Sequence, residues 1–107
     1  MNPEIDIQSS SGNVFADLNL PNSDEMLVNA ELARRIGEII AEQNITQAQA
    51  AELLRIERSK VAALIRGQLS GFSTSRLFQF LNALGRDIEI VVKPKPESRT
   101  EARISVI

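Results

Sequence analysis

The sequence predicts a mostly α-helical fold that ends in one C-terminal β-strand. Apolar residues recur at helical spacing in three stretches, over residues 21–43, 46–67 and 73–85, and each stretch is bounded by residues typical of helix caps. Beyond Gly85 the apolar period changes to two over residues 86–94, as in a half-buried strand. A chain of 107 residues holds one domain with short appendages.

Composition narrows the classes of function. The chain has no cysteine and no histidine, so it lacks a disulfide framework, a thiolate nucleophile and the commonest general base and metal ligand. We therefore expect no enzyme activity, no cofactor and no metal site. No apolar run is long enough to span a membrane, and the N-terminus lacks the pattern of a signal peptide, so we expect a cytoplasmic protein without membrane contact.

Charge is unevenly distributed along the chain. Residues 1–54 carry two basic and nine acidic side chains, a net charge of −7, whereas residues 55–107 carry ten basic and five acidic ones, a net charge of +5. This asymmetry favours a basic face that approaches phosphates and an acidic part with another task. The alternative is a solvated surface on which the charges are segregated by accident.

The first twenty residues predict an arm that is partly disordered. They begin as a polar, Ser-rich lead and become more apolar at Val14, Phe15 and Leu18, which have the spacing of one helical turn. Such a turn would dock either on the domain or on a partner, and the residues leave both possibilities open.

Pro21 breaks the chain, and the residues after it offer N-caps for a long helix that is predicted to extend to about Gln43; these N-cap candidates are Asn22, Ser23 and Asp24. Its expected buried stripe consists of Met26, Leu27, Ala30, Ala33, Ile36, Ile39 and Ile40. The pairs Glu31–Arg35 and Arg34–Glu38 have i,i+4 spacing on the opposite side, which indicates a solvated helix face rather than a catalytic pair of acids. Asn44 follows as a residue suited to helix termination, and Ile45 is expected to pack across the start of the next helix.

Residues 46–67 predict two short helices joined by a tight turn. Thr46 and Gln49 have the spacing of a capping box. The second helix begins at about Arg58 and is expected to turn Val61, Leu64 and Ile65 inward, with Gly67 after its end. The remaining residues face outward and give a small, basic surface that fits a major groove: Arg58, Ser59, Lys60, Ala63 and Arg66.

A loop with two glycines leads to a last helix that Ser73 can cap. Phe72 and Leu77 are spaced as a hydrophobic staple, and Gly85 ends the helix. The apolar set of this helix is broad enough to be buried on more than one side, so we interpret its aromatic residues as core rather than as a base-stacking platform. This set comprises Leu77, Phe78, Phe80, Leu81 and Leu84.

Residues 86–94 predict a strand that needs a partner, because a helical bundle has no sheet to receive it. The partner is either the same strand of a second subunit, which would make 86–94 a dimerisation element, or the C-terminal residues 102–107. We favour the symmetric dimer. Residues 95–107 are rich in charge and proline and are expected to form a flexible tail.

The segment 46–67 resembles the helix-turn-helix of the Cro/C1 (XRE) family. Gln47 opens the first helix, Ala51 is the small residue where the helices touch, Ile56 is the hydrophobic residue of the turn, and Val61 and Leu64 are core positions. Arg55 stands where the family usually has glycine. The resemblance implies a compact, lambda-repressor-like bundle of four to five helices, in which residues 21–85 form a DNA-binding domain.

The resemblance is not confined to the helix-turn-helix segment. Over residues 12–96 the chain is similar to HigA-type antitoxins. The resemblance implies a transcriptional repressor in the bacterial cytoplasm and nucleoid, which neutralises a RelE/HigB-like toxin and represses the operon that encodes both. A stand-alone or phage-type repressor is the alternative, and a pure protein-interaction module is a third possibility.

Each part of the motif has an expected task on double-stranded DNA. Thr46 and Gln47 would meet a phosphate, Arg58 would read guanine, and Ala63 would allow close approach or a thymine methyl contact. Because one such domain binds a single half-site weakly, a homodimer on a palindromic operator is expected. The full predicted DNA-binding set is Thr46, Gln47, Arg58, Ser59, Lys60, Ala63, Arg66, Gln68, Ser70 and Ser73.

Overall fold

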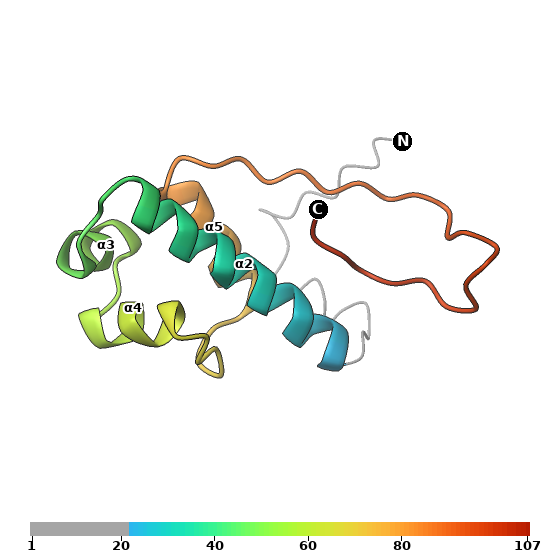
Figure 1. Ribbon diagram of the computed structural model, residues 1–107, viewed down its shortest axis with the longest axis horizontal. Helices are drawn as coiled ribbons and strands as arrows, with labels where there is room; N and C mark the ends of the chain where they lie inside the picture. Colours follow the sequence, from blue (N-terminus) through green and yellow to red (C-terminus); the bar gives the residue numbers. More distant parts are fainter. Residues whose placement is uncertain (1–21) are drawn as a thin grey trace.

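Four α-helices and an extended C-terminal segment make up the part of the chain described by the computed structural model, residues 22–107 (Figure 1). The helices are α2 (Asn22–Glu42), α3 (Gln47–Leu54), α4 (Arg58–Ile65) and α5 (Thr74–Ala83). The mostly helical fold is thus confirmed. The expected N-terminal arm, with its single turn at Val14–Leu18, lies outside the described residues.

Helix α2 is the longest element, and it packs against both α5 and α4. Its buried face contains Ile36, which is fully inaccessible to solvent, together with the predicted residues Ala33, Ile39 and Ile40. The predicted stripe was wrong over the first turns: Met26 and Leu27 are each 69% exposed, and Ala30 is also exposed.

The buried positions in the first half of α2 are instead Val28 and Leu32. These two residues continue the stripe that passes through Ile36 with i,i+4 steps, whereas Leu27 and Ala30 project from the other side of the helix. Both sides carry apolar residues here, so the position of α5 decides which side is buried.

A buried polar pair joins α2 to α5. The Thr74 hydroxyl donates a hydrogen bond of 2.5 Å to Oδ1 of Asn29, and both side chains are buried. A buried polar group is stable only when it is hydrogen-bonded, so the two residues specify the register of one helix against the other. The apolar pattern alone contained no sign of this pair.

The aromatic residues of the last helix belong to the core, as predicted. The rings of Phe72 and Phe80 meet edge to face, with centroids 5.8 Å apart and planes at 78°, and both residues are buried. Leu77, Leu81 and Leu84 are buried around them, while Phe78 is half-buried against the same core. The α5 N-cap is also as predicted, because the Ser73 hydroxyl accepts a hydrogen bond from the Arg76 backbone N–H.

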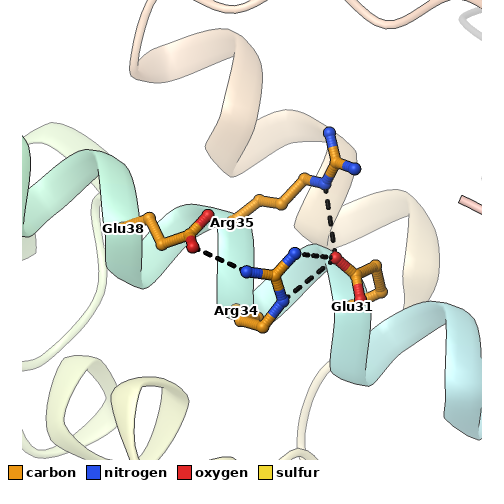
Figure 2. A network of polar contacts seen from close by, with 4 residues as sticks. All are labelled: Glu31, Arg34, Arg35 and Glu38. Atoms are coloured by element: carbon orange, nitrogen blue, oxygen red, sulfur yellow. Dashed lines mark hydrogen bonds and ion pairs between the residues drawn. The ribbon is translucent and has the colours of Figure 1, made fainter. Parts of the chain in front are cut away.

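The outer face of α2 carries a network of ion pairs (Figure 2). Arg34 lies between two acids: it binds Glu31 through both Nε and Nη2, and its Nη1 donates to Glu38 over 2.6 Å. Arg35 adds a longer contact of 3.4 Å to Glu31. Both predicted i,i+4 pairs are therefore present on a solvated face.

This network shifts the pKa values of Glu31 and Arg34. The hydrogen bond from Arg34 is the main reason why the pKa of Glu31 is lowered, and the same bond raises the pKa of Arg34.

The predicted strand at residues 86–94 is not present as a strand in this single chain. The segment is extended but has no strand hydrogen bonding. Its first residue, Arg86, donates its N–H to the carbonyl of Leu81 in α5, and no backbone hydrogen bond joins residues 87–94 to residues 102–107 or to another described segment. A strand is defined by its partner, and the helical bundle offers none. Pairing within the chain is thus not observed, whereas pairing between subunits stays a prediction.

The tail beyond α5 leads away from the end of the molecule at which α3 and α4 lie (Figure 1). Ile88, Ile104 and Val106 are partly buried against the core, but Val91 and Val92 are 73% and 72% exposed. None of the described helices is long and apolar enough to cross a membrane.

Candidate nucleic-acid interface

Helix α3 begins with the capping box that the sequence predicted. The Thr46 hydroxyl accepts the Gln49 backbone N–H over 3.1 Å, and the Gln49 side-chain oxygen accepts the Thr46 N–H over 2.9 Å. The backbone N–H groups of Gln47 and Ala48 have no acceptor among the described residues. These two groups therefore point outward from the positive end of the helix.

The turn between α3 and α4 is closed by Arg55 in the left-handed region, at φ 59° and ψ 45°. Arg55 N–H and Ile56 N–H both donate to the carbonyl of Ala51, which ends α3 within its last turn. Ile56 then packs half-buried against the core. The chain thus forms the tight turn that the two helices require, although a residue with a side chain occupies a position that favours glycine.

Helix α4 is held to the bundle by Val61 and Leu64, which are essentially inaccessible to solvent. The prediction that Ile65 is buried was wrong, because its side chain is 44% exposed. Successive residues of an α-helix are rotated by about 100°, so Ile65 lies at the edge of the face that Val61 and Leu64 define. The opposite face is centred on Ser59 and Arg66.

The outward face of α4 has small side chains at its centre and basic side chains at its margins. Ala62 and Ala63 are half-buried between Ser59 and Arg66, so nothing bulky separates the helix backbone from an approaching surface. Arg58 and Lys60 lie on the two sides of this strip and are exposed. A helix of this shape can approach the floor of a groove while its long side chains reach sideways.

The cations of this face are available for a partner. Arg58, Lys60 and Arg66 form no ion pair with any residue in the range 22–107. Glu57 is the N-cap residue of α4, but its side chain makes no capping hydrogen bond, and the Arg58 and Ser59 N–H groups have no described acceptor. The first turn of α4 therefore presents both side-chain cations and free backbone donors.

The flanking residues of the predicted DNA-binding set differ in whether their side chains already form hydrogen bonds within the protein. Gln68 and Ser70 are exposed in the loop that joins α4 to α5. The Ser73 hydroxyl already accepts the Arg76 N–H and lies 3.3 Å from the Ser75 hydroxyl, and the Thr46 hydroxyl is likewise used within its own cap. Thr46 and Ser73 therefore act as helix caps. A ligand would contact the remaining lone pairs of their hydroxyl groups and the residues next to them.

Sequence reasoning missed three residues of this surface: Glu57, Ala62 and Ile65. A count of helical angles from Val61 and Leu64 would have placed Ala62 on the outer face and Ile65 at its edge. An exposed isoleucine on such a helix is suited to contact a thymine methyl group, and an exposed glutamate can accept a hydrogen bond from cytosine.

The two short helices, their tight turn and the basic outer face of α4 define the class of protein: a helix-turn-helix protein of the XRE type. The family model described as "Helix-turn-helix domain" matches residues 14–93, and the chain belongs to this family. The chain is accordingly an XRE-family helix-turn-helix transcriptional regulator that binds DNA.

Two individual proteins are similar to the chain. A solved structure named "Putative XRE Family Transcriptional Regulator" superposes with a TM-score of 0.77 at 44% sequence identity, over 81% of this chain and 98% of that one. A Mycobacterium tuberculosis (strain ATCC 25618 / H37Rv) protein named "Putative antitoxin HigA2" is 33% identical over 70 residues, which cover 65% of this chain and 69% of that protein.

Proposed function

We propose that the chain is a dimeric repressor of its own operon and the antitoxin of a toxin–antitoxin pair. The observation that carries the DNA-binding half is the outer face of α4, where free cations flank a strip of small residues. Helix α4 lies in the major groove with its N-terminal turn against base edges.

Each residue of the interface has a separate role in this arrangement. Arg58 donates in a bidentate manner to guanine, and Ser59 and Lys60 contact neighbouring bases or phosphates. Ala63 allows close approach to the groove floor. The residues beyond α4, including Arg66, Gln68 and Ser70, contact the DNA backbone, together with the free N–H groups at the start of α3.

The DNA-binding proposal is tested with the DNA immediately upstream of the gene, by measuring affinity across a salt series. Arg58→Ala is compared with Arg35→Ala, which removes the same charge from α2 while Glu31 keeps its partner Arg34. We expect Arg58→Ala to lose roughly ten- to a hundredfold in affinity at its guanine, equivalent to about 1–3 kcal/mol, and Arg35→Ala to bind like the parent. Equal, sequence-independent binding by all three proteins would contradict the proposal.

Two observations support the antitoxin half. One relative is named as an antitoxin, and the N-terminal half of the chain, with a net charge of −7, complements a basic RNA-cleaving partner. On α2, Glu38 is exposed and Glu31 is partly exposed, although Arg34 neutralises part of their charge. The expected partner is a RelE/HigB-like toxin encoded beside the gene.

The antitoxin proposal is tested by expressing the neighbouring gene product alone and together with this chain. Growth arrest by the neighbour, relieved by this chain and by its Arg58→Ala variant, would support neutralisation independent of DNA binding. A variant without residues 1–21 separates the contribution of the arm, because unchanged neutralisation would assign toxin binding to the helical domain. If the neighbour has no toxic effect, the alternative function, a stand-alone or phage-type repressor, replaces the antitoxin.

A further inference from the structure

In the extended segment 86–94, Arg86 is hydrogen-bonded to Leu81 and Asn82 of α5, and the residues after it, 87–94, form an apolar edge without a backbone partner among the described residues. It has no strand hydrogen bonds, and its residues Ile90, Val91 and Val92 are 45%, 73% and 72% exposed. An extended backbone with free N–H and C=O groups and β-branched side chains is a template for strand pairing. We propose that this edge pairs in antiparallel register with the same segment of a second copy, centred on Ile90.

The choice of a second copy rests on charge complementarity within the segment itself. In an antiparallel pair centred on Ile90, Asp87 of each copy lies opposite Lys93 of the other, so the two-fold axis creates two ion pairs from one sequence. On the other side of the ribbon, Ile88 lies opposite Val92, and Ile90 lies opposite itself. Every charged residue between 87 and 93 except Glu89 is then matched by an opposite charge.

Neighbouring registers place other side chains opposite each other. A one-residue slip between the strands would place apolar residues opposite charged ones, because strand side chains alternate between the two faces. Centring on Glu89 would place two glutamates opposite each other at the axis. Centring on Val91 would pair Glu89 with Lys93 and Asp87 with Lys95, but it would place Ile88 opposite Pro94. The preference for Ile90 therefore rests on the apolar pair that Ile88 forms with Val92.

Pro94 also determines which pairs exchange hydrogen bonds. In an antiparallel ladder, opposite residues alternate between hydrogen-bonded and non-hydrogen-bonded pairs, and proline has no N–H to donate. Pro94, opposite Arg86, must therefore occupy a non-hydrogen-bonded position. Asp87 with Lys93, and Glu89 with Val91, then exchange the ladder hydrogen bonds, while Ile90 meets its symmetry mate in a close, non-hydrogen-bonded pair.

The orientation of the ribbon follows from Ile88, which is partly buried against the helical core. Ile90 and Val92 share its face of the strand, so this apolar face turns toward the two bundles. The ribbon deepens the proposed function, because it supplies the two-fold symmetry that a palindromic operator requires. Its test uses no DNA, and its failure is therefore distinguishable from failure of the repressor proposal.

Cysteine scanning tests the register cleanly, because the chain has no native cysteine. Ile90→Cys is expected to form a disulfide-linked dimer under mild oxidation, since directly opposite non-hydrogen-bonded residues bring their Cβ atoms within disulfide reach. Val91→Cys and the exposed tail variant Ser98→Cys serve as controls and should remain largely monomeric on denaturing gels. Preferential linkage through Val91→Cys would overturn the register.

Exchange of the charged residues Asp87 and Lys93 tests the pairing of the strands without disulfide cross-linking. In sedimentation equilibrium, Asp87→Lys and Lys93→Asp should each weaken the dimer roughly tenfold, and the double exchange should restore it. Helical circular dichroism is measured on every variant to confirm that the bundle folds. A parent chain that stays monomeric at all concentrations, or a double exchange as weak as the single ones, would overturn the ribbon.

Discussion

Arg55 is the residue at which the helix-turn-helix carries conformational strain. Its φ of 59° is unfavourable for a residue with a Cβ atom, and the α3–α4 turn imposes it because Arg55 and Ile56 must both bond to Ala51. The sequence indicated this position, since glycine is usual there in similar proteins. Only the structure shows that the chain accepts the strain and keeps the turn.

Replacement of Arg55 by glycine should therefore stabilise the protein. We expect Arg55→Gly to raise the free energy of unfolding by about 0.5–1 kcal/mol, the relief of left-handed strain less the added entropy of the unfolded chain. Urea denaturation measures the change. Arg66→Gly is the matched control: Arg66 caps α4 at φ −81°, where glycine has no advantage, so a gain there would contradict the explanation.

The hydrogen bond between Thr74 and Asn29 is the buried polar contact of α2 with α5. Thr74→Val preserves shape but leaves the Asn29 amide without its donor, and we expect a loss of about 1–3 kcal/mol in the free energy of unfolding. Thermal or urea unfolding provides the measurement. Ser70→Ala, which alters an exposed hydroxyl, should change stability little. A loss of equal size there would assign the effect to something other than burial.

At the scale of elements, helix ends and helix faces were predicted with different success. The caps at Thr46 and Ser73 were predicted because a short motif determines them locally. The buried face of α2 was mistaken over its first turns, where Leu27 is exposed and Leu32 is buried. A cap depends on residues three positions apart, whereas a buried face depends on where another helix packs.

The ion-pair network on α2 predicts a dependence of stability on pH. The hydrogen bond that Arg34 donates to Glu31 lowers the pKa of Glu31 in the folded state. The network therefore stabilises the fold at pH values above the unfolded-state pKa of Glu31. This contribution is lost as the pH falls through the lowered folded-state pKa. Glu31→Gln should therefore differ most from the parent near neutral pH and least in acid.

Denaturation curves at a series of pH values, at low and high salt, measure this effect. Because the network is exposed, added salt should reduce the difference between the parent and Glu31→Gln at neutral pH. Glu97→Gln in the tail, where no described ion pair is formed, is the control. A difference that grows toward acid pH would have the wrong sign for this mechanism.

At the scale of the whole molecule, the two halves of the chain have net charges of opposite sign, but the outer face of α4, which we propose binds DNA, is locally basic. Arg58, Lys60 and Arg66 from each of two subunits would supply six phosphate or base contacts in the proposed dimer. The net charge of −2 is therefore a poor guide to affinity for nucleic acid.

DNA affinity is expected to depend steeply on salt in spite of that net charge. If six or more contacts release counterions, affinity should fall by roughly a thousandfold or more between 50 and 200 mM salt. Lys60→Ala should flatten the slope of log affinity against log salt, while Arg35→Ala should leave the slope unchanged. Fluorescence anisotropy with the upstream DNA measures both, and a salt-independent affinity would argue against phosphate contacts by this face.

The sequence by itself determined the helical class, the two caps and the basic residues of α4. Each of these follows from interactions over a few positions, in which propensity and spacing act without distant partners. The tertiary structure decided which side of α2 is buried, that Asn29 bonds to Thr74, and that Ile65 stays exposed. It also decided that residues 86–94 form no strand within one chain. These properties depend on elements far apart in the sequence, or on a second chain, because a buried face and a strand both require a partner to exist.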